Sequence, residues 1–269
     1  MFDTDKTPAT GHDSGLHHPV DISAEEDHAR ALAARYGGLD AEGLLDAVIN
    51  REFAGRVALV SSFGVESAVL LDLVARVDPD TPVIFIDTGK LFPETLAYCD
   101  RLVEFCGLGN VRTIAPDADL VAARDSDGTL WSRDPDACCA LRKVLPLGAA
   151  LVGFDAWISG RKRFHGGGRE ALETIESDGQ RIKISPLAHW TQDDIERYLT
   201  LHDLPRHPLA AEGFASLGCQ PCTRRVAAGE TVRAGRWAGA DKTECGIHLS
   251  GLSLVCAGGR RSERKNGDR

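Results

Sequence analysis

The chain has 269 residues, with 31 Lys and Arg against 40 Asp and Glu, and a formal net charge of −9. At roughly 100–200 residues per domain this length allows one large domain or two small ones, and the acidic balance argues against a general nucleic-acid coat or a binder of anionic membranes. A run of the roughly 18–20 apolar residues that span a membrane is absent, as is a secretory signal, so we expect a cytoplasmic protein, in which structural disulfides are rare.

Regular structure is predicted from residue 23 onward, because residues 1–22 are polar and fit a disordered tail. Ser23 and Glu26 form a capping-box signature at the start of a helix that ends at Tyr36, before two glycines. Apolar strands and amphipathic helices then alternate. We expect strands at 57–60, 83–86, 111–115 and 156–158, helices at 40–53, 65–77, 93–106, 117–124 and 136–150, an edge strand at 182–184 and a closing helix at 191–203.

This alternation is typical of βαβ crossovers and predicts an α/β fold, with a mostly parallel sheet and helices on both faces. We assign residues 23–204 to this domain. Residues 205–269, which turn to Gly, Arg and Cys, are expected to form an irregular and partly mobile extension. Ligands of such sheets lie outside the carboxyl ends of the strands, so the loops after residues 60, 86, 115 and 158 are the candidate binding loops.

Several of these loops have the features of an anion site. Ser61–Ser67 lies between a strand and a helix, whose free N–H groups and dipole favour a phosphate, although the ending of a Walker A loop is absent. Asp87–Lys90 occupies the same position after the next strand. Residues 159–169 hold four Lys and Arg and no acid, and residues 224–236 hold four Arg against one Glu. Since Arg makes bidentate contacts with phosphate and sulfate, these runs predict a pocket for a compact polyanion, and a nucleotide fits best.

Four cysteines form two close pairs, Cys138-Cys139 and Cys219-x2-Cys222, which suggest one metal centre built from two chain segments. Structural zinc usually takes pairs separated by two to four residues, whereas an adjacent pair suits an iron–sulfur cluster, whose iron atoms offer separate attachment points. Zinc and a redox disulfide are the alternatives. The start of the helix at Asp134-Pro135 is expected to favour thiolates, and Lys143 to place a positive charge beside the cluster.

The other cysteines differ in their surroundings. Cys99 and Cys106 lie in an apolar helix and are predicted to be buried. Cys245 stands in Glu-Cys-Gly-Ile-His, is not buried by pattern, and is close to His248 and the Arg run, so it is a candidate nucleophile with a lowered pKa. Cys256 is a rival that lacks this context.

Together these motifs resemble the assimilatory sulfonucleotide reductases, the bacterial 5′-adenylylsulfate (APS) reductases, over roughly residues 30–250. The resemblance implies a Rossmann-like sheet of the adenine nucleotide α-hydrolase type. Residues 163–168, Arg-Phe-His-Gly-Gly-Gly, depart from the Arg-Arg-Asp-Gln-Ser type of loop expected in the family. The motifs that carry the resemblance are the Ser61–Ser67 loop, Asp87-Thr88-Gly89-Lys90-Leu91-Phe92-Pro93-Glu94-Thr95, Cys138-Cys139-x3-Lys143, Gly218-Cys219-x2-Cys222-Thr223-Arg224, Arg233-x2-Arg236-Trp237 and Glu244-Cys245-Gly246-x-His248.

The resemblance implies reduction of APS to sulfite and AMP in sulfate assimilation, with thioredoxin as electron donor. Cys245 would attack the sulfate sulfur, expel AMP and form Cys–S–SO3⁻, from which a thioredoxin thiol would release sulfite. The implied ligands of one 4Fe-4S cluster are Cys138, Cys139, Cys219 and Cys222, and we hypothesise that the cluster organises the pocket electrostatically through Lys143.

Because thiolate and sulfate are both anions, the pocket needs concentrated positive charge. We expect it from Lys143, Arg169, Arg233, Arg236 and His248. The Ser61–Ser67 loop would hold the α-phosphate and ribose, with Thr88 and Gly89 near the adenine. The full set of predicted substrate-binding residues is Ser61, Ser62, Gly64, Glu66, Ser67, Thr88, Gly89, Lys90, Lys143, Arg161, Arg169, Arg233, Arg236 and His248.

The complete cysteine quartet favours APS, because the forms of the family that use 3′-phosphoadenylylsulfate (PAPS) generally lack it. One alternative is a PAPS or dual APS/PAPS reductase. Another is an ATP-pyrophosphatase of the same superfamily, although its Ser-Gly-Gly-x-Asp-Ser loop is missing. A third is an iron–sulfur sensor module, which would leave Cys245 unexplained. We expect no nucleic-acid or membrane partner, and a homo-oligomer remains open.

Overall fold

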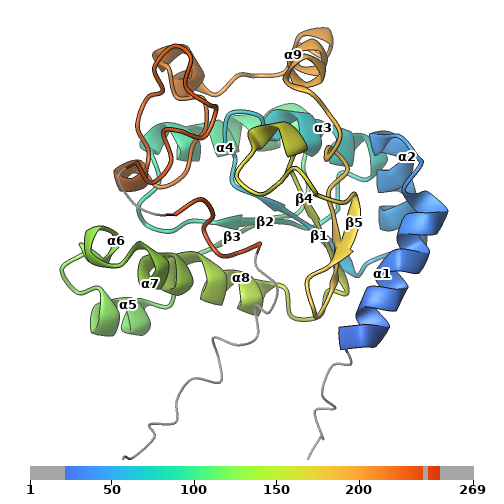
Figure 1. The fold of residues 1–269 in the computed structure, drawn as a ribbon, viewed down its shortest axis with the longest axis horizontal. Coiled ribbons are helices and arrows are strands. Elements are labelled where there is room, and N and C mark those ends of the chain that lie inside the picture. The colour runs from blue at the N-terminus through green and yellow to red at the C-terminus, as the bar shows by residue number, and fades with distance from the viewer. Residues whose placement is uncertain (1–21, 239–241, 249–269) are drawn as a thin grey trace, which may run out of the picture.

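A six-stranded, mostly parallel sheet forms the centre of the molecule (Figure 1). The computed structural model describes residues 22–238 and 242–248. The strand order is β3-β2-β1-β4-β6-β5, and all neighbours are parallel except β5 and β6. The predicted α/β fold class is therefore confirmed. The strands are β1 (Val57–Ser61), β2 (Val83–Ile86), β3 (Val111–Ile114), β4 (Ala156–Ser159), β5 (Ile175–Ser177) and β6 (Ile182–Ile184).

Helices cover both faces of the sheet (Figure 1). On one side lie α3 (Ser67–Val77) and α4 (Pro93–Cys106), and on the other lies the series from α5 (Ala118–Arg124) to α8 (Leu145–Ala150). Helix α1 (Ile22–Tyr36) packs along β5. The remaining elements are α2 (Ala41–Asp46), α6 (Leu130–Arg133), α7 (Pro135–Cys139), α9 (Gln192–Leu201), the π turns η1 (Ala47–Glu52) and η2 (Ala140–Val144), and the 3₁₀ turns η3 (Arg163–His165), η4 (Pro208–Glu212) and η5 (Gln220–Cys222).

Successive residues of the strands enter two apolar clusters, one on each face. On β1, Leu59 joins the cluster formed with α3 and α4, whereas Ala58 joins the cluster formed with Leu147 and Leu151 of the α8 side. A parallel sheet buried on both faces needs apolar residues at consecutive positions. This is why the central strands read as continuous apolar runs.

The prediction that residues 182–184 form an edge strand is wrong. β6 lies between β4 and β5, and β5 is the antiparallel edge strand that the sequence analysis missed. Lys183 lies inside the sheet, since its side chain is only 2% exposed and its Nζ lies 2.8 Å from Glu176 on β5. The cross-strand carboxylate allows a lysine inside the sheet, because a buried charge with a partner is tolerated.

Two helix boundaries differ in an informative way from the prediction. Helix α1 includes Ile22, so Ser23 lies inside the helix and not at its cap. The helix predicted at 136–150 is a continuous helical segment, but it contains the π turn at 140–144 directly after Cys139. Such turns are rare and are frequently found at functional sites, because the extra residue redirects the side chains that follow.

Residues 205–238 contain the 3₁₀ turns η4 and η5 and pack against α4 and the residues just before it. Tyr98 Oη donates to the Pro205 carbonyl at 2.7 Å, and Leu209 and Leu217 form an apolar cluster with Phe92. A β-bridge pairs Leu91 with Cys219. These contacts bring the second cysteine pair beside the loop that follows β2.

Among the described residues, we find no helix whose length and apolar character would let it cross a bilayer. The predicted N-terminal tail (residues 1–22, apart from Ile22) and the rival nucleophile Cys256 lie outside the described residues.

Candidate active site

A cavity of about 220 Å³ opens at the carboxyl ends of β1, β2 and β4. β1 lies between the other two at the point where the strand order reverses, which is where sheets of this class bind ligands. The loop after β3, also predicted to bind, contributes none of the described residues that line the cavity. The predicted residues that do line it are Ser61, Ser62, Gly64, Glu66, Ser67, Thr88, Lys143, Arg161, Arg169, Arg233, Arg236, Cys245 and His248.

Gly89 and Lys90 were also predicted to bind substrate, but neither is among the residues that line this cavity. Lys90 borders a second, smaller pocket and its Nζ donates to the Gly128 carbonyl at 2.7 Å. Gly89 has a φ of +67°, and a Cβ added there would lie 3.6 Å from Nη1 of Arg142. The loop after β2 therefore divides its residues between the two pockets.

A buried aromatic residue shapes the Ser61–Ser67 loop. Phe63 is fully buried at a φ of 47°, and its ring packs edge-on against Phe85 with centroids 4.9 Å apart. Its backbone N–H donates to Ser61 Oγ at 3.2 Å. A bulky residue with positive φ is strained, and such residues persist where the surroundings fix them, often at ligand sites. The buried ring thus fixes the backbone that presents Ser62 and Gly64 to the cavity.

Glu66 pairs with two basic side chains that sequence reasoning missed, Lys162 and His165, and burial lowers the pKa of the His165 imidazole. The Glu66 carboxylate accepts hydrogen bonds from Lys162 Nζ at 2.7 Å and from His165 Nε2 at 3.0 Å. Burial alone would raise the pKa of Glu66, but the hydrogen bond from His165 and the charge of Lys162 lower it to about 2. The only signal in the sequence was the basic run after β4. The pairing shows that part of this run is already neutralised inside the protein.

Not every N–H group of the cavity arginines has a hydrogen-bond partner in the described part of the chain. Arg161 Nη1 donates to Glu176 at 3.1 Å, and Arg236 Nη1 donates to the Leu217 carbonyl at 2.6 Å. Among the described residues, Nε of Arg161, Nε of Arg236 and Nδ1 of His248 are buried without a hydrogen-bond partner. Buried polar atoms are nearly always paired. Three unpaired atoms bordering one cavity indicate that it is built for a ligand rich in acceptors.

Three cations lie over the ring of Trp237. The ring centroid lies 4.5 Å from the Arg236 guanidinium, 5.9 Å from that of Arg233 and 5.7 Å from Lys242 Nζ. Cation–π attraction of this kind helps to hold several cations close together. Gly218 makes room for the arrangement, because a Cβ there would meet Arg236 Nη2 at 2.1 Å.

Residues 242–248 place Cys245 on the cavity. Lys242 pairs with Asp136 at the start of the cysteine-bearing helix, Arg233 Nη2 donates to the Thr243 carbonyl at 2.8 Å, and Glu244 pairs with Arg169. Further along, the ring of His248 stacks on Trp157, with centroids 5.6 Å apart. Each of these contacts involves a residue within three positions of Cys245, so together they fix the half-buried thiol against the arginines.

His248 was expected to supply positive charge, and the structure gives it a different character. Burial and the neighbouring charge of Lys183 lower its pKa well below the ordinary value, and Arg161, Arg169 and Arg233 lower it further. The imidazole is therefore neutral near pH 7. It can donate or accept a hydrogen bond at the cavity but adds no charge to it.

The four paired cysteines border the second pocket, together with Lys143 and Trp237, which line both pockets. None of the four is in a disulfide. Burial raises the pKa of Cys138 and raises that of Cys139 to about 11, so burial outweighs the helix start that was expected to favour thiolates. Thiols in this setting ionise only beside strong positive charge, as a bound metal provides.

The donor set of the second pocket consists of four thiols. No group of three or more His, Cys, Asp or Glu side chains in the described ranges is arranged to hold one metal ion, although four thiols surround one pocket. A cluster attaches each thiolate to a different iron atom and so accepts ligands spread around it. Four thiols around one pocket therefore fit the attachment points of such a cluster.

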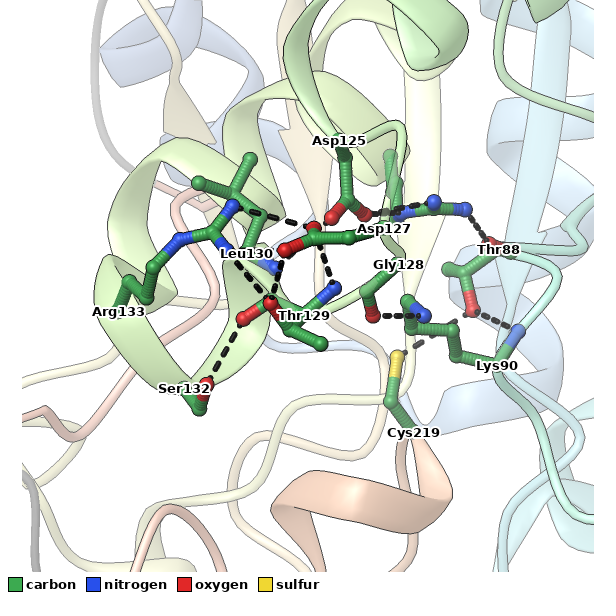
Figure 2. A network of polar contacts seen from close by, with 11 residues as sticks. Thr88, Lys90, Asp125, Asp127, Gly128, Thr129, Leu130, Ser132, Arg133 and Cys219 are labelled. Carbon is green, nitrogen blue, oxygen red and sulfur yellow. Dashed lines mark hydrogen bonds and ion pairs between the residues drawn. The ribbon is translucent and has the colours of Figure 1, made fainter.

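Figure 2 shows the polar network that supports this second pocket. Thr88 Oγ1 lies 3.3 Å from Cys219 Sγ, and the Thr88 carbonyl accepts a hydrogen bond from Arg142 Nη1 at 2.8 Å. Arg142 also donates from Nε and Nη2 to Asp125, at 3.0 and 2.7 Å. The loop after β2 is thereby tied to both cysteine-bearing segments.

Lys143 lies at the junction of the two pockets, and its surroundings raise the pKa of its ammonium group. Burial alone would lower the pKa of its ammonium group, but Cys219 on one side and Cys245 on the other outweigh burial and raise it. Lys143 therefore stays charged between the cysteine pocket and the cavity. The sequence predicted this position from its spacing to Cys139.

Comparisons with known proteins agree with this geometry. Residues 56–225 match the phosphoadenosine phosphosulfate reductase domain. The chain is 49% identical over 226 residues to the adenosine 5′-phosphosulfate reductase of Mesorhizobium japonicum, covering 84% of this chain and 89% of that protein. It is 44% identical over 200 residues to the protein of the same name from Streptomyces coelicolor, covering 73% and 83% of the two chains.

Among solved structures, the chain is similar to the phosphoadenylyl-sulfate (PAPS) reductase of Candida auris, with a TM-score of 0.64. That match covers 74% of this chain and 97% of the other at 24% sequence identity, and it supports the fold alone. The domain match and the identity to the bacterial proteins carry the assignment of family. This chain belongs to the phosphoadenosine phosphosulfate reductase family, among relatives named adenosine 5′-phosphosulfate reductase.

Proposed function

We propose that this protein reduces adenosine 5′-phosphosulfate to sulfite and AMP, as a step of sulfate assimilation. One observation carries the proposal: Cys245 borders the same cavity as Lys143, Arg161, Arg169, Arg233 and Arg236. A thiolate and a sulfate ester repel one another, so bringing them together requires concentrated, water-excluded positive charge. The names of the relatives supply the substrate.

In the first step, Sγ of Cys245 attacks the sulfate sulfur of the substrate. The bond between this sulfur and the bridging oxygen breaks, its electron pair leaves with AMP, and Cys245 carries –SO3⁻. The guanidinium groups of Arg161 and Arg236, each with an unpaired Nε, would donate hydrogen bonds to the anionic oxygens. The backbone at the start of α3 and the Ser61–Ser67 loop would hold the α-phosphate.

In the second step, a thiolate of reduced thioredoxin attacks Sγ of Cys245. Sulfite leaves with the electron pair of the sulfur–sulfur bond, and a mixed disulfide remains. The second thioredoxin thiol then displaces Cys245 as a thiolate. Thioredoxin is oxidised to its disulfide, and its two electrons account for the reduction of sulfate to sulfite.

Cys138, Cys139, Cys219 and Cys222 would hold one 4Fe-4S cluster, which when bound supplies a charged, polarisable group beside Lys143. The residue that acts on substrate from this side is Lys143, since it lines both pockets. Its ammonium group would stabilise the transferring sulfonate. We also propose a cytoplasmic location, because free thiols and reduced thioredoxin would be maintained there.

The test is a sulfite-release assay with reduced thioredoxin, in which APS and PAPS are compared for the wild type, Cys245→Ser and Cys106→Ser. We expect sulfite from APS, complete loss in Cys245→Ser because a hydroxyl cannot form the thiosulfonate, and full activity in Cys106→Ser. Cys106 is a matched control, because it is half-buried on α4, outside the cavity, and burial raises its pKa to about 12.

Comparable turnover of PAPS would make the enzyme dual in specificity and show that the cysteine quartet does not dictate the nucleotide. No sulfite from either nucleotide, in a preparation with its iron–sulfur absorption intact, would contradict the proposed reaction and favour a sensor module or a pyrophosphatase.

A further inference from the structure

One carboxylate, that of Glu244, occupies an arginine of the cavity, Arg169. Arg169 donates from Nε to Oε1 of Glu244 at 2.6 Å, and its Nη2 lies 2.6 Å from the same oxygen. The side chains are buried, with 7% and 15% of their surfaces exposed. Arg233 Nη2 approaches the other oxygen, Oε2, at 3.7 Å. Glu244 immediately precedes Cys245.

The Nε–Nη2 edge is the one through which arginine binds sulfate and phosphate in bidentate fashion. In this structure Glu244 takes that edge of Arg169. The remaining hydrogen bond of Arg169, from Nη1, goes to His165 Nδ1 at 3.3 Å. An anion that binds Arg169 through its preferred edge must therefore displace the carboxylate.

Other cations of the cavity already have carboxylate partners. Arg161 is paired with Glu176, and Lys162 is paired with Glu66. Burial, and after it the neighbouring charge of Arg169, lower the pKa of Arg233 to about 10. Glu244 is the carboxylate that the segment 242–248 brings to this charge.

We propose that Glu244 is a positioning residue that substitutes for the substrate anion on Arg169 and Arg233, and that substrate binding exchanges one anion for the other. The pairing holds Cys245 at the cavity before the substrate arrives. Release of Glu244 makes Arg169 available to the sulfate or phosphate group. The identity of the substrate rests on the proposed function, but competition for Arg169 applies to any tetrahedral oxyanion.

The exchange makes a quantitative prediction. If the Glu244–Arg169 pair is formed in about nine molecules out of ten, the apparent Kd of a competing anion is raised about tenfold. Glu244→Gln removes the competing charge and keeps the shape of the side chain. We therefore expect inorganic sulfate to bind Glu244→Gln about tenfold more tightly than the wild type, and Glu244→Asp, which keeps the charge, to stay within about threefold of it.

The experiment measures the Kd of inorganic sulfate by calorimetry on the full-length holoenzyme. In parallel, the rate of iodoacetamide alkylation of Cys245 is followed by peptide mass spectrometry. We expect faster alkylation in Glu244→Gln, because Cys245 loses one of its anchors. Glu212→Gln is the matched control, since Glu212 is also paired with an arginine, Arg225, but lies outside the cavity, and both measurements should stay at wild-type values.

Faster alkylation combined with unchanged or weaker sulfate binding would overturn the exchange and leave Glu244 as an anchor only. If Glu244→Gln matched the wild type in both the alkylation rate of Cys245 and the Kd of sulfate, both the anchoring and the anion exchange would be contradicted. With APS as substrate, the exchange also predicts a lower KM in Glu244→Gln without a rise in kcat. A wild-type enzyme that fails to turn over APS contradicts the proposed function, whereas the sulfate measurement tests the exchange independently.

Discussion

At the scale of single residues, Arg142 and Lys143 are neighbours in the π turn after Cys139 but have separate tasks. Arg142 is buried behind the cysteines, where it joins Asp125 to the Thr88 carbonyl. Lys143 lines both the cavity and the cysteine pocket. The two cations that follow Cys139 therefore serve one structural bridge and one reactive site.

The structural task of Arg142 can be tested through its partner. The Asp125 side chain is fully buried, and Leu130 N–H and Arg142 lower its pKa despite burial, which would raise it. Removing one member of a buried ion pair leaves the other charge unpaired and costs about 3–5 kcal/mol. We expect Asp125→Asn to lower Tm, measured by calorimetry, by about 10 °C.

Asp127→Asn is the matched control for this change, since Asp127 belongs to the same network (Figure 2) and pairs with Arg133 at the surface. Exposed pairs contribute little to stability, so Tm should stay close to the wild-type value. Equal changes of Tm in the two variants would show that the buried Asp125–Arg142 pair stabilises the fold no more than the exposed pair does.

At the scale of elements, His207 connects the irregular C-terminal segment to α4. Its Nδ1 accepts a hydrogen bond from Leu209 N–H at 3.2 Å, its Nε2 lies 3.1 Å from Thr95 Oγ1, and its ring packs edge-on against Tyr98. Because Nδ1 is an acceptor, the proton sits on Nε2 and the ring is neutral. The attachment of residues 205–213 thus depends on an uncharged histidine.

This dependence predicts acid sensitivity. Burial lowers the pKa of His207 to about 4, against about 6.5 in the unfolded chain. Between these values the unfolded state binds a proton that the folded state excludes, so the free energy of unfolding falls as pH falls from about 6.5 to 4. The contribution is complete above pH 6.5, and its loss amounts to about 3 kcal/mol.

The measurement is urea unfolding at several pH values across this window. His207→Asn keeps an acceptor for Leu209 N–H but cannot titrate, so we expect a shallower pH dependence than in the wild type. Parallel slopes for the two proteins would contradict the assignment and transfer the acid sensitivity to other groups.

At the scale of the whole molecule, the sequence was most informative where one physical requirement dominates. Strands buried on both faces must be continuously apolar, so the central strands and their order along the chain could be predicted. The loop motifs, together with the family resemblance that they support, predicted thirteen of the residues that line the cavity. Spacing also predicted the pairing of two distant cysteine segments.

The features that could not be predicted depend on contacts between residues that are distant in the sequence. Lys183 looks like an exposed residue until Glu176 is seen across the strand pair. Lys162 and His165 are unremarkable members of a basic run until both meet Glu66. His248 was expected to be charged, but burial and the surrounding cations lower its pKa. In each case the fold, and not the local pattern, determines the charge state.

The cysteine quartet gives the last prediction, because it joins segments that are about 80 residues apart in the chain. A cross-link over a loop of this length restricts the unfolded chain by about 4–5 kcal/mol in the entropic account used for disulfides. If the four thiolates hold one cluster, removing its iron with a chelator should lower Tm on the order of 10 °C. Limited proteolysis should then cut residues 205–238 first, while the sheet resists.

Cys245→Ser serves as the control, since it changes a cysteine of the cavity that does not border the second pocket. It should keep its iron, its acid-labile sulfide and the same loss of Tm on chelation, whereas Cys222→Ser should show the low Tm before any chelator is added. A chelated wild type with an unchanged Tm would mean that the contacts of Leu91, His207 and Leu209 alone hold the C-terminal segment on the sheet. The metal would then have only the electrostatic task next to Lys143, and loss of iron would affect turnover without affecting the fold.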